Sequence, residues 1–232
     1  MNRRHCLLAA LGLTVAICSP LCRGQTPAPP MGELKPLGED RFQIGRIVVD
    51  KRAGTFTVPG RVQVLGKPLE YLATSPGGHK AYESLLELDA TGSEFNLACI
   101  LVGLERAPNQ AAFARYSREP LAGERAAIYI AWSEGTTPRK LSAADALRNP
   151  QTGAKAEPID WVYLGSPVSK AGGPFAADVT GTLIGFVHDP TSVMESVGGV
   201  GIGAYGSVQG NMALPPVGSA IELIVEVPHV KK

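Results

Sequence analysis

Two short segments of this 232-residue chain combine residue types that bind ligands or carry out chemistry. In the first, the glycine pair Gly77-Gly78 is followed by His79, Lys80 and, three residues later, Glu83. A loop of this kind can place backbone N–H groups around an anion. We therefore predict that His79, Lys80 and Glu83 take part in ligand binding. The alternative is an ordinary strand connection with polar residues at its tip.

The second segment is His188-Asp189, which ends a predicted strand and supplies an imidazole and a carboxylate for ligand binding. Because Asp before proline initiates turns, a structural role is the simpler interpretation of this pair. The alternative function is a metal-assisted hydrolase, which requires the fold to bring His79, Glu83, His188 and Asp189 together. We predict no metal, since His79, His188 and His229 lack the four-residue spacing of ligands on one helix face.

Covalent catalysis is not indicated by any motif. The chain has no G-x-S-x-G segment and no S-x-x-K segment with its companion motifs. Cys99 lies in an apolar run over residues 97–104, where burial raises the pKa of a thiol and leaves it unreactive. We therefore predict no catalytic residue and a binding protein rather than an enzyme.

One glycine-rich segment imitates a dinucleotide-binding motif. Residues 201–206 read G-I-G-A-Y-G, which matches G-x-G-x-x-G. That motif needs a helix directly after it, whose N-terminus faces the pyrophosphate. Here Pro215-Pro216 and two further glycines follow, so no helix can easily start. We predict a surface loop at this position and no cofactor.

The N-terminal residues have the pattern of a secretory signal. Arg3 and Arg4 precede an apolar run over residues 6–18, which is too short to cross a bilayer as a helix. Small residues precede a cleavage position after Gly24. We therefore expect residues 1–24 to be a signal peptide, and the protein to be periplasmic or extracellular with no membrane span in the mature chain.

Removal of that signal changes the charge and the cysteine content. The chain loses three of its 22 basic residues and none of its 21 acidic ones, which leaves a net charge of about −2. This balance argues against nucleic acid and against an anionic membrane surface as partners. Of four cysteines only Cys99 remains, so neither an internal disulfide nor a four-cysteine cluster can form. The expected partner is a small ligand or an envelope protein.

The elements that must position these residues are short strands. The 27 glycines and 19 prolines exceed average usage and predict many turns. We expect a Pro-rich tether over residues 25–41 and one domain over residues 42–232. Predicted strands cover residues 42–49, 55–58, 61–65, 69–74, 82–88, 126–132, 160–165, 182–188 and 220–227. In the last of these, apolar and acidic residues alternate as in a half-buried antiparallel strand.

Two helices are predicted. Thr91 and Glu94 have capping-box spacing, and the apolar run behind them indicates a buried helix, with a central strand as the alternative. A short helix is expected to begin at Ser142 and to end before Pro150. The predicted fold is therefore a β-rich α+β domain, with a mainly antiparallel sheet, one buried helix and one short helix.

Several segments resemble those of the YdjY-domain family. They are residues 47–50, 68–72, 77–78, 83–86, 160–163, 181–190 and 214–218, and they extend over most of residues 45–228. The resemblance implies an exported bacterial protein without an established activity, and it carries over no catalytic residue. Some relatives are described as ferredoxin-like iron–sulfur proteins. This chain departs from that description because one mature cysteine cannot hold a cluster.

Overall fold

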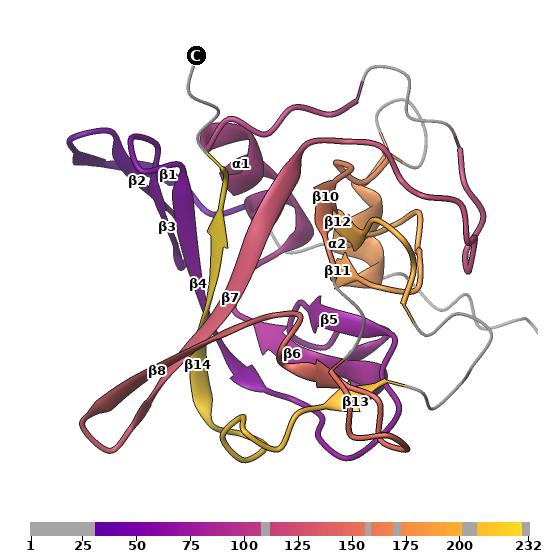
Figure 1. The fold of residues 1–232 in the computed structure, drawn as a ribbon. Coiled ribbons are helices and arrows are strands. Elements are labelled where there is room, and N and C mark those ends of the chain that lie inside the picture. Colours follow the sequence, from indigo (N-terminus) through magenta and orange to yellow (C-terminus); the bar gives the residue numbers. More distant parts are fainter. Residues whose placement is uncertain (1–30, 108–111, 156–158, 169–172, 201–207, 229–232) are drawn as a thin grey trace, which may run out of the picture.

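The computed structural model describes residues 31–107, 112–155, 159–168, 173–200 and 208–228, and within them one large sheet closes into a barrel (Figure 1). The closed ring runs β4–β14–β7–β10–β12–β11–β5–β6, and β6 pairs back onto β4. The eight strands are β4 (Thr55–Val62), β14 (Ala220–Glu226), β7 (Arg125–Glu134), β10 (Trp161–Tyr163), β12 (Met194–Ser196), β11 (Thr182–Gly185), β5 (Tyr71–Thr74) and β6 (Ser84–Leu88).

The pairing in this barrel is mixed, so the prediction of an α+β fold with a mainly antiparallel sheet is wrong. Strand β5 runs parallel to β6, and β11 runs parallel to β12. Strands β5, β6, β11 and β12 are buried along their whole length. A strand buried on both faces has no alternation of polar and apolar residues, and its sequence does not show the direction of its neighbours.

The barrel interior is built from alternate residues of the antiparallel strands. Along β14, Ile221, Leu223 and Val225 are buried, as the alternation predicts. Leu223 stands opposite Val58 of β4 on one side and Ile130 of β7 on the other. Each of these three side chains has no exposed surface, so they form one apolar layer across three strands.

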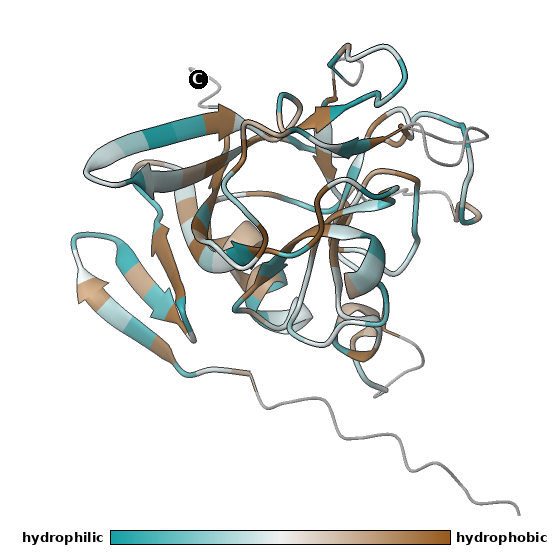
Figure 2. Cartoon of the chain, turned by 90° about the horizontal axis from the view of Figure 1, so that it is seen from below, coloured by the Kyte–Doolittle hydropathy of each residue, from teal (hydrophilic) through white to brown (hydrophobic). Residues whose placement is uncertain are grey.

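Further strands extend from this barrel. β1 (Leu34–Gly38), β2 (Arg41–Ile44) and β3 (Ile47–Asp50) continue the sheet beyond β4, and β8 (Thr137–Ser142) pairs with β7. Figure 2 shows hydrophilic residues along the projecting β7–β8 hairpin. β9 (Leu147–Arg148) and β13 (Gln209–Gly210) form a separate small sheet.

The strands β1, β2 and β3 and one predicted helix differ from the sequence-based expectation. Strand β1 lies inside the segment expected to be a tether, so strand structure begins before residue 42. A turn at Gly45 divides the expected strand over residues 42–49 into β2 and β3. The helix expected from Ser142 is also wrong: the Ser142 hydroxyl oxygen accepts from the Asp145 N–H at 3.0 Å in a turn, and β9 follows.

Helix α1 (Gly92–Leu101) confirms the predicted capping box. The Thr91 hydroxyl oxygen accepts from the Glu94 N–H at 3.1 Å, and the Glu94 carboxylate accepts from the Thr91 N–H at 2.8 Å. Phe95 packs edge-on against Phe56 of β4, with ring centroids 5.3 Å apart. The helix is not buried on every side, since Ile100 is 50% exposed. Burial of Cys99 raises the pKa of its thiol, as expected.

The second helix, α2 (Ala176–Thr180), packs against the start of α1, and a single 3₁₀ turn, η1 (Ala81–Glu83), precedes β6. In the part of the chain that the structure describes, no helix has the length and apolar content needed to cross a bilayer. The expected signal peptide over residues 1–24 and the glycine motif over residues 201–206 lie outside the described residues.

Candidate functional site

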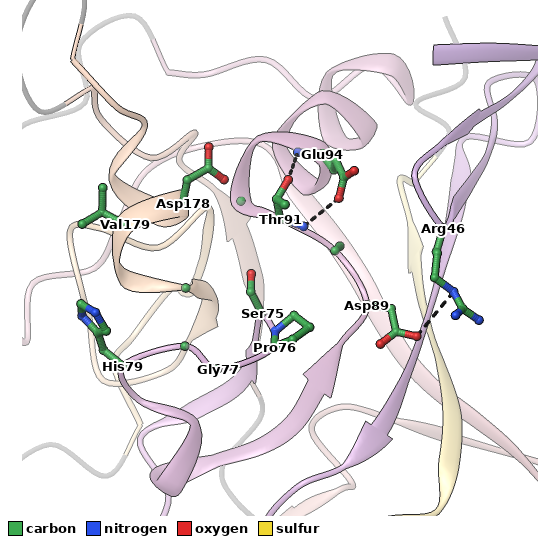
Figure 3. Close-up of a pocket in the computed structure, with 14 residues that line it drawn as sticks. Arg46, Ser75, Pro76, Gly77, His79, Asp89, Thr91, Glu94, Asp178 and Val179 are labelled. Carbon is green, nitrogen blue, oxygen red and sulfur yellow. Dashed lines mark hydrogen bonds and ion pairs between the residues drawn. The ribbon is translucent and has the colours of Figure 1, made fainter. Parts of the chain in front are cut away.

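A cavity of about 440 Å³ lies beside the loop that follows β5 (Figure 3). The loop over residues 75–79 forms one side, and the starts of α1 and α2 form another. The turn between β2 and β3 reaches it through Arg46. Its lining residues are Arg46, Ser75, Pro76, Gly77, Gly78, His79, Asp89, Ala90, Thr91, Gly92, Glu94, Asp178, Val179 and Gly181.

Backbone hydrogen bonds hold the loop in place. The N–H of Ser75 donates to the carbonyl of Gly181 at 2.8 Å, and the N–H of His79 donates to that of Thr180 at 2.9 Å. The N–H of Gly78 donates to the carbonyl of Ser75 at 3.0 Å. These three N–H groups are therefore occupied, and they do not form the anion cradle that the sequence suggested.

Glycines let the walls of the cavity approach one another. A Cβ atom on Gly181, whose φ is 73°, would lie 2.5 Å from the Cα of Gly78. A Cβ atom on Gly92 would lie 2.6 Å from that of Ala177. Because backbone or packed side chains stand in the way, any larger residue at either position separates α2 from the loop or from α1.

Two carboxylates in the lining have structural partners. Besides capping α1, Glu94 accepts from the N–H of Gly32 at 2.9 Å. Asp178 on α2 accepts from both the N–H and the hydroxyl of Ser93 in the first turn of α1. A carboxylate at this end of a helix is favoured by the helix dipole. These two carboxylates therefore stabilise the start of α1 through hydrogen bonds within the protein, which is a structural role.

Other polar groups in the lining are not held by strong hydrogen bonds or ion pairs among the described residues. The Nε atom of Arg46 lies 3.5 Å from the Oδ2 atom of Asp89, and the Arg46 side chain is 70% exposed. An exposed pair with one long contact is weak. The Ser75 hydroxyl is buried without a hydrogen-bond partner among the described residues. His79 is exposed at the margin of the cavity. Opposite charges and an imidazole thus border one space.

A second polar cluster lies inside the fold, around Glu195 of β12. This carboxyl group has no exposed surface, and it accepts from the N–H groups of His188 and Asp189 at 3.2 and 2.9 Å. Gly185 of the neighbouring strand β11 makes room for it, since a Cβ atom there would lie 2.1 Å from the carboxyl oxygen. Burial raises the pKa of Glu195 to about 8.

Hydrogen bonds connect this cluster with the surface. The Tyr71 hydroxyl donates to Asp189 at 2.6 Å, and Arg115 donates through Nη2 to the Tyr71 hydroxyl and to Glu70, each at 2.9 Å. The Tyr116 hydroxyl, near the surface, donates to Glu70 at 3.0 Å. Burial and the bond to Asp189 raise the pKa of Tyr71 well above its ordinary value.

The other predicted residue of this cluster, His188, is fully buried. Its Nε2 atom lies 3.0 Å from the carbonyl oxygen of Ser196, so Nε2 carries the proton and donates, because a carbonyl only accepts. Burial lowers the pKa of His188. The ring of Phe113 packs edge-on against the imidazole, with centroids 5.9 Å apart. His188 is therefore a packed and hydrogen-bonded core residue.

The five candidate residues fall into three places. His79 borders the cavity; Lys80 pairs with Glu83 and donates to the Tyr82 hydroxyl at 3.0 Å; His188 and Asp189 join the buried cluster. Among the residues that the structure describes, no group of three or more His, Cys, Asp or Glu side chains could hold a metal ion. The four residues of the hydrolase alternative thus do not form a metal site.

Sequence reasoning missed Arg46, Asp89, Tyr71, Arg115 and Glu195. Four of them are ordinary polar residues whose partners are far away in the chain. Glu195 had a detectable signal, because it is an acidic residue in the middle of the short apolar run V-M-E-S-V over residues 193–197.

A comparison with family models finds one match, the YdjY domain, over residues 47–226. The matched range includes the buried cluster and all of the cavity lining except Arg46. No curated protein and no solved structure matches the chain.

Proposed function

The chain belongs to the YdjY-domain family, and from that premise we propose that it is an exported module that binds a small ligand in the cavity beside residues 75–79. The observation that carries the proposal is the cavity itself, whose volume of about 440 Å³ falls in the range of small-molecule sites. Export rests on the basic and apolar pattern of residues 1–24.

The charges at the cavity indicate the ligand class. Arg46 and Asp89 present opposite charges side by side in a weak pair. A ligand with a carboxylate next to an ammonium group pairs with both side chains at once, as an α-amino acid does. Pro76 and Val179 provide apolar surface for its side chain. The proposed ligand is therefore a small zwitterion with an apolar substituent.

Calorimetric titration with three matched compounds tests this class. L-leucine carries both charges, 4-methylpentanoate lacks the ammonium group, and 3-methylbutylamine lacks the carboxylate. We expect L-leucine to bind at least ten times more tightly than either. In Asp89→Asn, which no longer pairs with the ammonium group, L-leucine should bind no more tightly than 4-methylpentanoate. In Arg46→Gln, which no longer pairs with the carboxylate, L-leucine should bind no more tightly than 3-methylbutylamine. Equal affinity of the wild type for all three compounds, or no binding of L-leucine, contradicts the zwitterion proposal.

The place of binding is tested by filling the cavity. Val179 is 39% exposed in the lining, so Val179→Trp puts an indole into the space. Ile100→Trp is the matched control, because Ile100 is an exposed apolar residue of α1 outside the lining. Native mass spectrometry of the protein purified from cells then reports retained small molecules of any class. We expect retention in the control and loss in Val179→Trp; the same retention in both variants rules out this cavity.

Export is tested on the full chain with a C-terminal tag. We expect the tag in the periplasmic or extracellular fraction and an N-terminal sequence that begins at Gln25. A chain that keeps Met1 and stays in the cytoplasm contradicts this part of the proposal.

A further inference from the structure

The buried carboxyl of Glu195 lies next to other ionisable groups but has no basic side chain beside it among the described residues. Asp189, in the turn after β11, and Tyr71, on β5, are the ionisable side chains that interact with it, and the backbone N–H groups of His188 and Asp189 donate to it. Arg115 reaches Tyr71 and Glu70, yet it forms no ion pair with Glu195. A charge on Glu195 would therefore be buried beside the carboxylate of Asp189 without a cation to balance it.

The turn that contacts Glu195 also holds residues 112–118, which we call the strap. The Tyr116 N–H donates to the His188 carbonyl at 3.0 Å, and Phe113 packs against the His188 ring. Both Tyr116 and His188 have a φ of 62°, in the left-handed region that side chains disfavour. One hydrogen bond and one ring contact thus join the strap to the turn, and both residues of the hydrogen bond have a disfavoured backbone conformation.

We propose that Glu195 is a proton-controlled latch, which keeps the strap closed while its carboxyl is neutral and opens it when the proton is lost to solvent. The neutral carboxyl buries no charge beside Asp189, and this effect of burial outweighs the preference of the two N–H groups of the turn for the charged form. The carboxylate is stabilised by water, and the His188–Asp189 turn, whose two N–H groups contact it, must move to let water in. When this turn moves outward, the bond between Tyr116 and His188 breaks and the strain at both residues is released.

The pH range of the latch follows from its surroundings. Burial raises the pKa of Glu195 to about 8, whereas burial lowers the pKa of His188, which therefore stays neutral above pH 6.5. In the open form Glu195 regains an ordinary pKa near 4.5. Proton linkage then gives about thirty times more opening at pH 9 than at pH 6.5. The strap is closed in mildly acidic solution and opens in alkaline solution.

Hydrogen exchange on the purified protein, corrected for the intrinsic rate at each pH, tests the latch. Between pH 6.5 and 9 we expect protection of strap amides to fall by about thirty-fold, while that of the exposed strand β8, which frays locally without exposing Glu195, stays constant. Glu195→Gln should remove this dependence, because an amide has no proton to lose. Glu222→Gln, which changes an exposed acid of β14, is the matched control and should behave as the wild type.

Two results overturn the proposal: strap protection that is independent of pH in the wild type, or an unchanged pH dependence in Glu195→Gln. If Glu195→Gln does not fold, the same exchange measurement on Asp189→Asn tests the proposal. Removal of the neighbouring negative charge lowers the pKa of Glu195, so the opening midpoint must move to lower pH. An unmoved midpoint in that variant also contradicts the latch.

Discussion

The Tyr71 hydroxyl donates to the Asp189 carboxylate at 2.6 Å, and it accepts from Arg115 on its other side. Asp189 and Arg115 come from segments far from Tyr71 in the chain, so this one hydroxyl joins three parts of the fold. Tyr116 offers a natural comparison, because its hydroxyl also donates to a carboxylate, that of Glu70, but near the surface.

Removal of the two hydroxyls should have unequal effects. Tyr71→Phe removes a buried donor from the Asp189 carboxylate and an acceptor from Arg115, and it should lower the free energy of unfolding by about 2–3 kcal/mol. Tyr116→Phe should lower it by about 0.5 kcal/mol, since water replaces the lost bond. Urea unfolding of both variants at pH 7 measures the difference; equal losses contradict the assignment of Tyr71 as the buried link.

Stability should fall in alkaline solution. Glu195 has a raised pKa in the folded state, so the folded protein binds more protons than the unfolded chain between its ordinary value and about pH 8. The free energy of unfolding therefore decreases as the pH rises, by about 2 kcal/mol between pH 6.5 and 9. Urea midpoints across this pH range test whether stability falls as the pH rises. The midpoint of Glu195→Gln should not change over the range in which that of the wild type decreases.

His188 acts in the opposite direction below pH 6.5. Because burial lowers the pKa of its imidazole, the unfolded chain binds the extra proton there, and stability is lost as the pH falls. In the wild type this loss opposes the gain from protonation of Glu195. In Glu195→Gln the loss stands alone, so the urea midpoint of that variant should drop between pH 6.5 and 5 more steeply than that of the wild type.

Gly185 should tolerate no side chain. A methyl group there overlaps a carboxyl oxygen of Glu195 at 2.1 Å, so Gly185→Ala should cost about 3 kcal/mol of unfolding free energy. Gly198→Ala is the control, because no atom lies within 4 Å of its added Cβ. Glu195→Asp shortens the acid by one methylene, and in the Gly185→Ala background it should recover part of the loss. Absence of any recovery places the clash elsewhere.

The capping box of α1 should be worth about 1 kcal/mol. Thr91→Ala removes the oxygen that accepts from the Glu94 N–H and should lower the free energy of unfolding by that amount, whereas Thr91→Ser keeps the oxygen and should have little effect. Thermal unfolding of the two variants measures the difference. A similar loss in both would mean that the methyl group of Thr91, not its hydroxyl, stabilises the helix start.

The elements with local signals could be predicted from the sequence. Thr91 and Glu94 identified the start of α1, and the alternation along residues 220–227 identified β14 and its buried face. The expected strands over residues 42–49 and 55–58 flank a short link, across which β3 pairs with β4, and the Asp50 carboxylate there accepts from the Ala53 N–H at 2.8 Å. Each of these signals lies within a few residues of the structure that it specifies.

Barrel closure has no local signal. Gly60 opposite Leu88 and Tyr71 beside Ser84 are pairings between separate strands, and no residue within either strand specifies its partner. The candidate site was predictable only in part for the same reason. His79 was found because it stands in a distinctive loop, but Arg46 and Asp89 meet only after β3, β4 and β6 have paired.

The position of β14 in the ring bears on how the molecule is made. This strand follows all others of the barrel in the chain, yet it lies between β4 and β7. Until Ala220–Glu226 is available, β4 and β7 each keep an unpaired edge, and the ring cannot close. The barrel therefore closes only after Ala220–Glu226 has left the ribosome, so its closure is a late event in synthesis rather than a stepwise one.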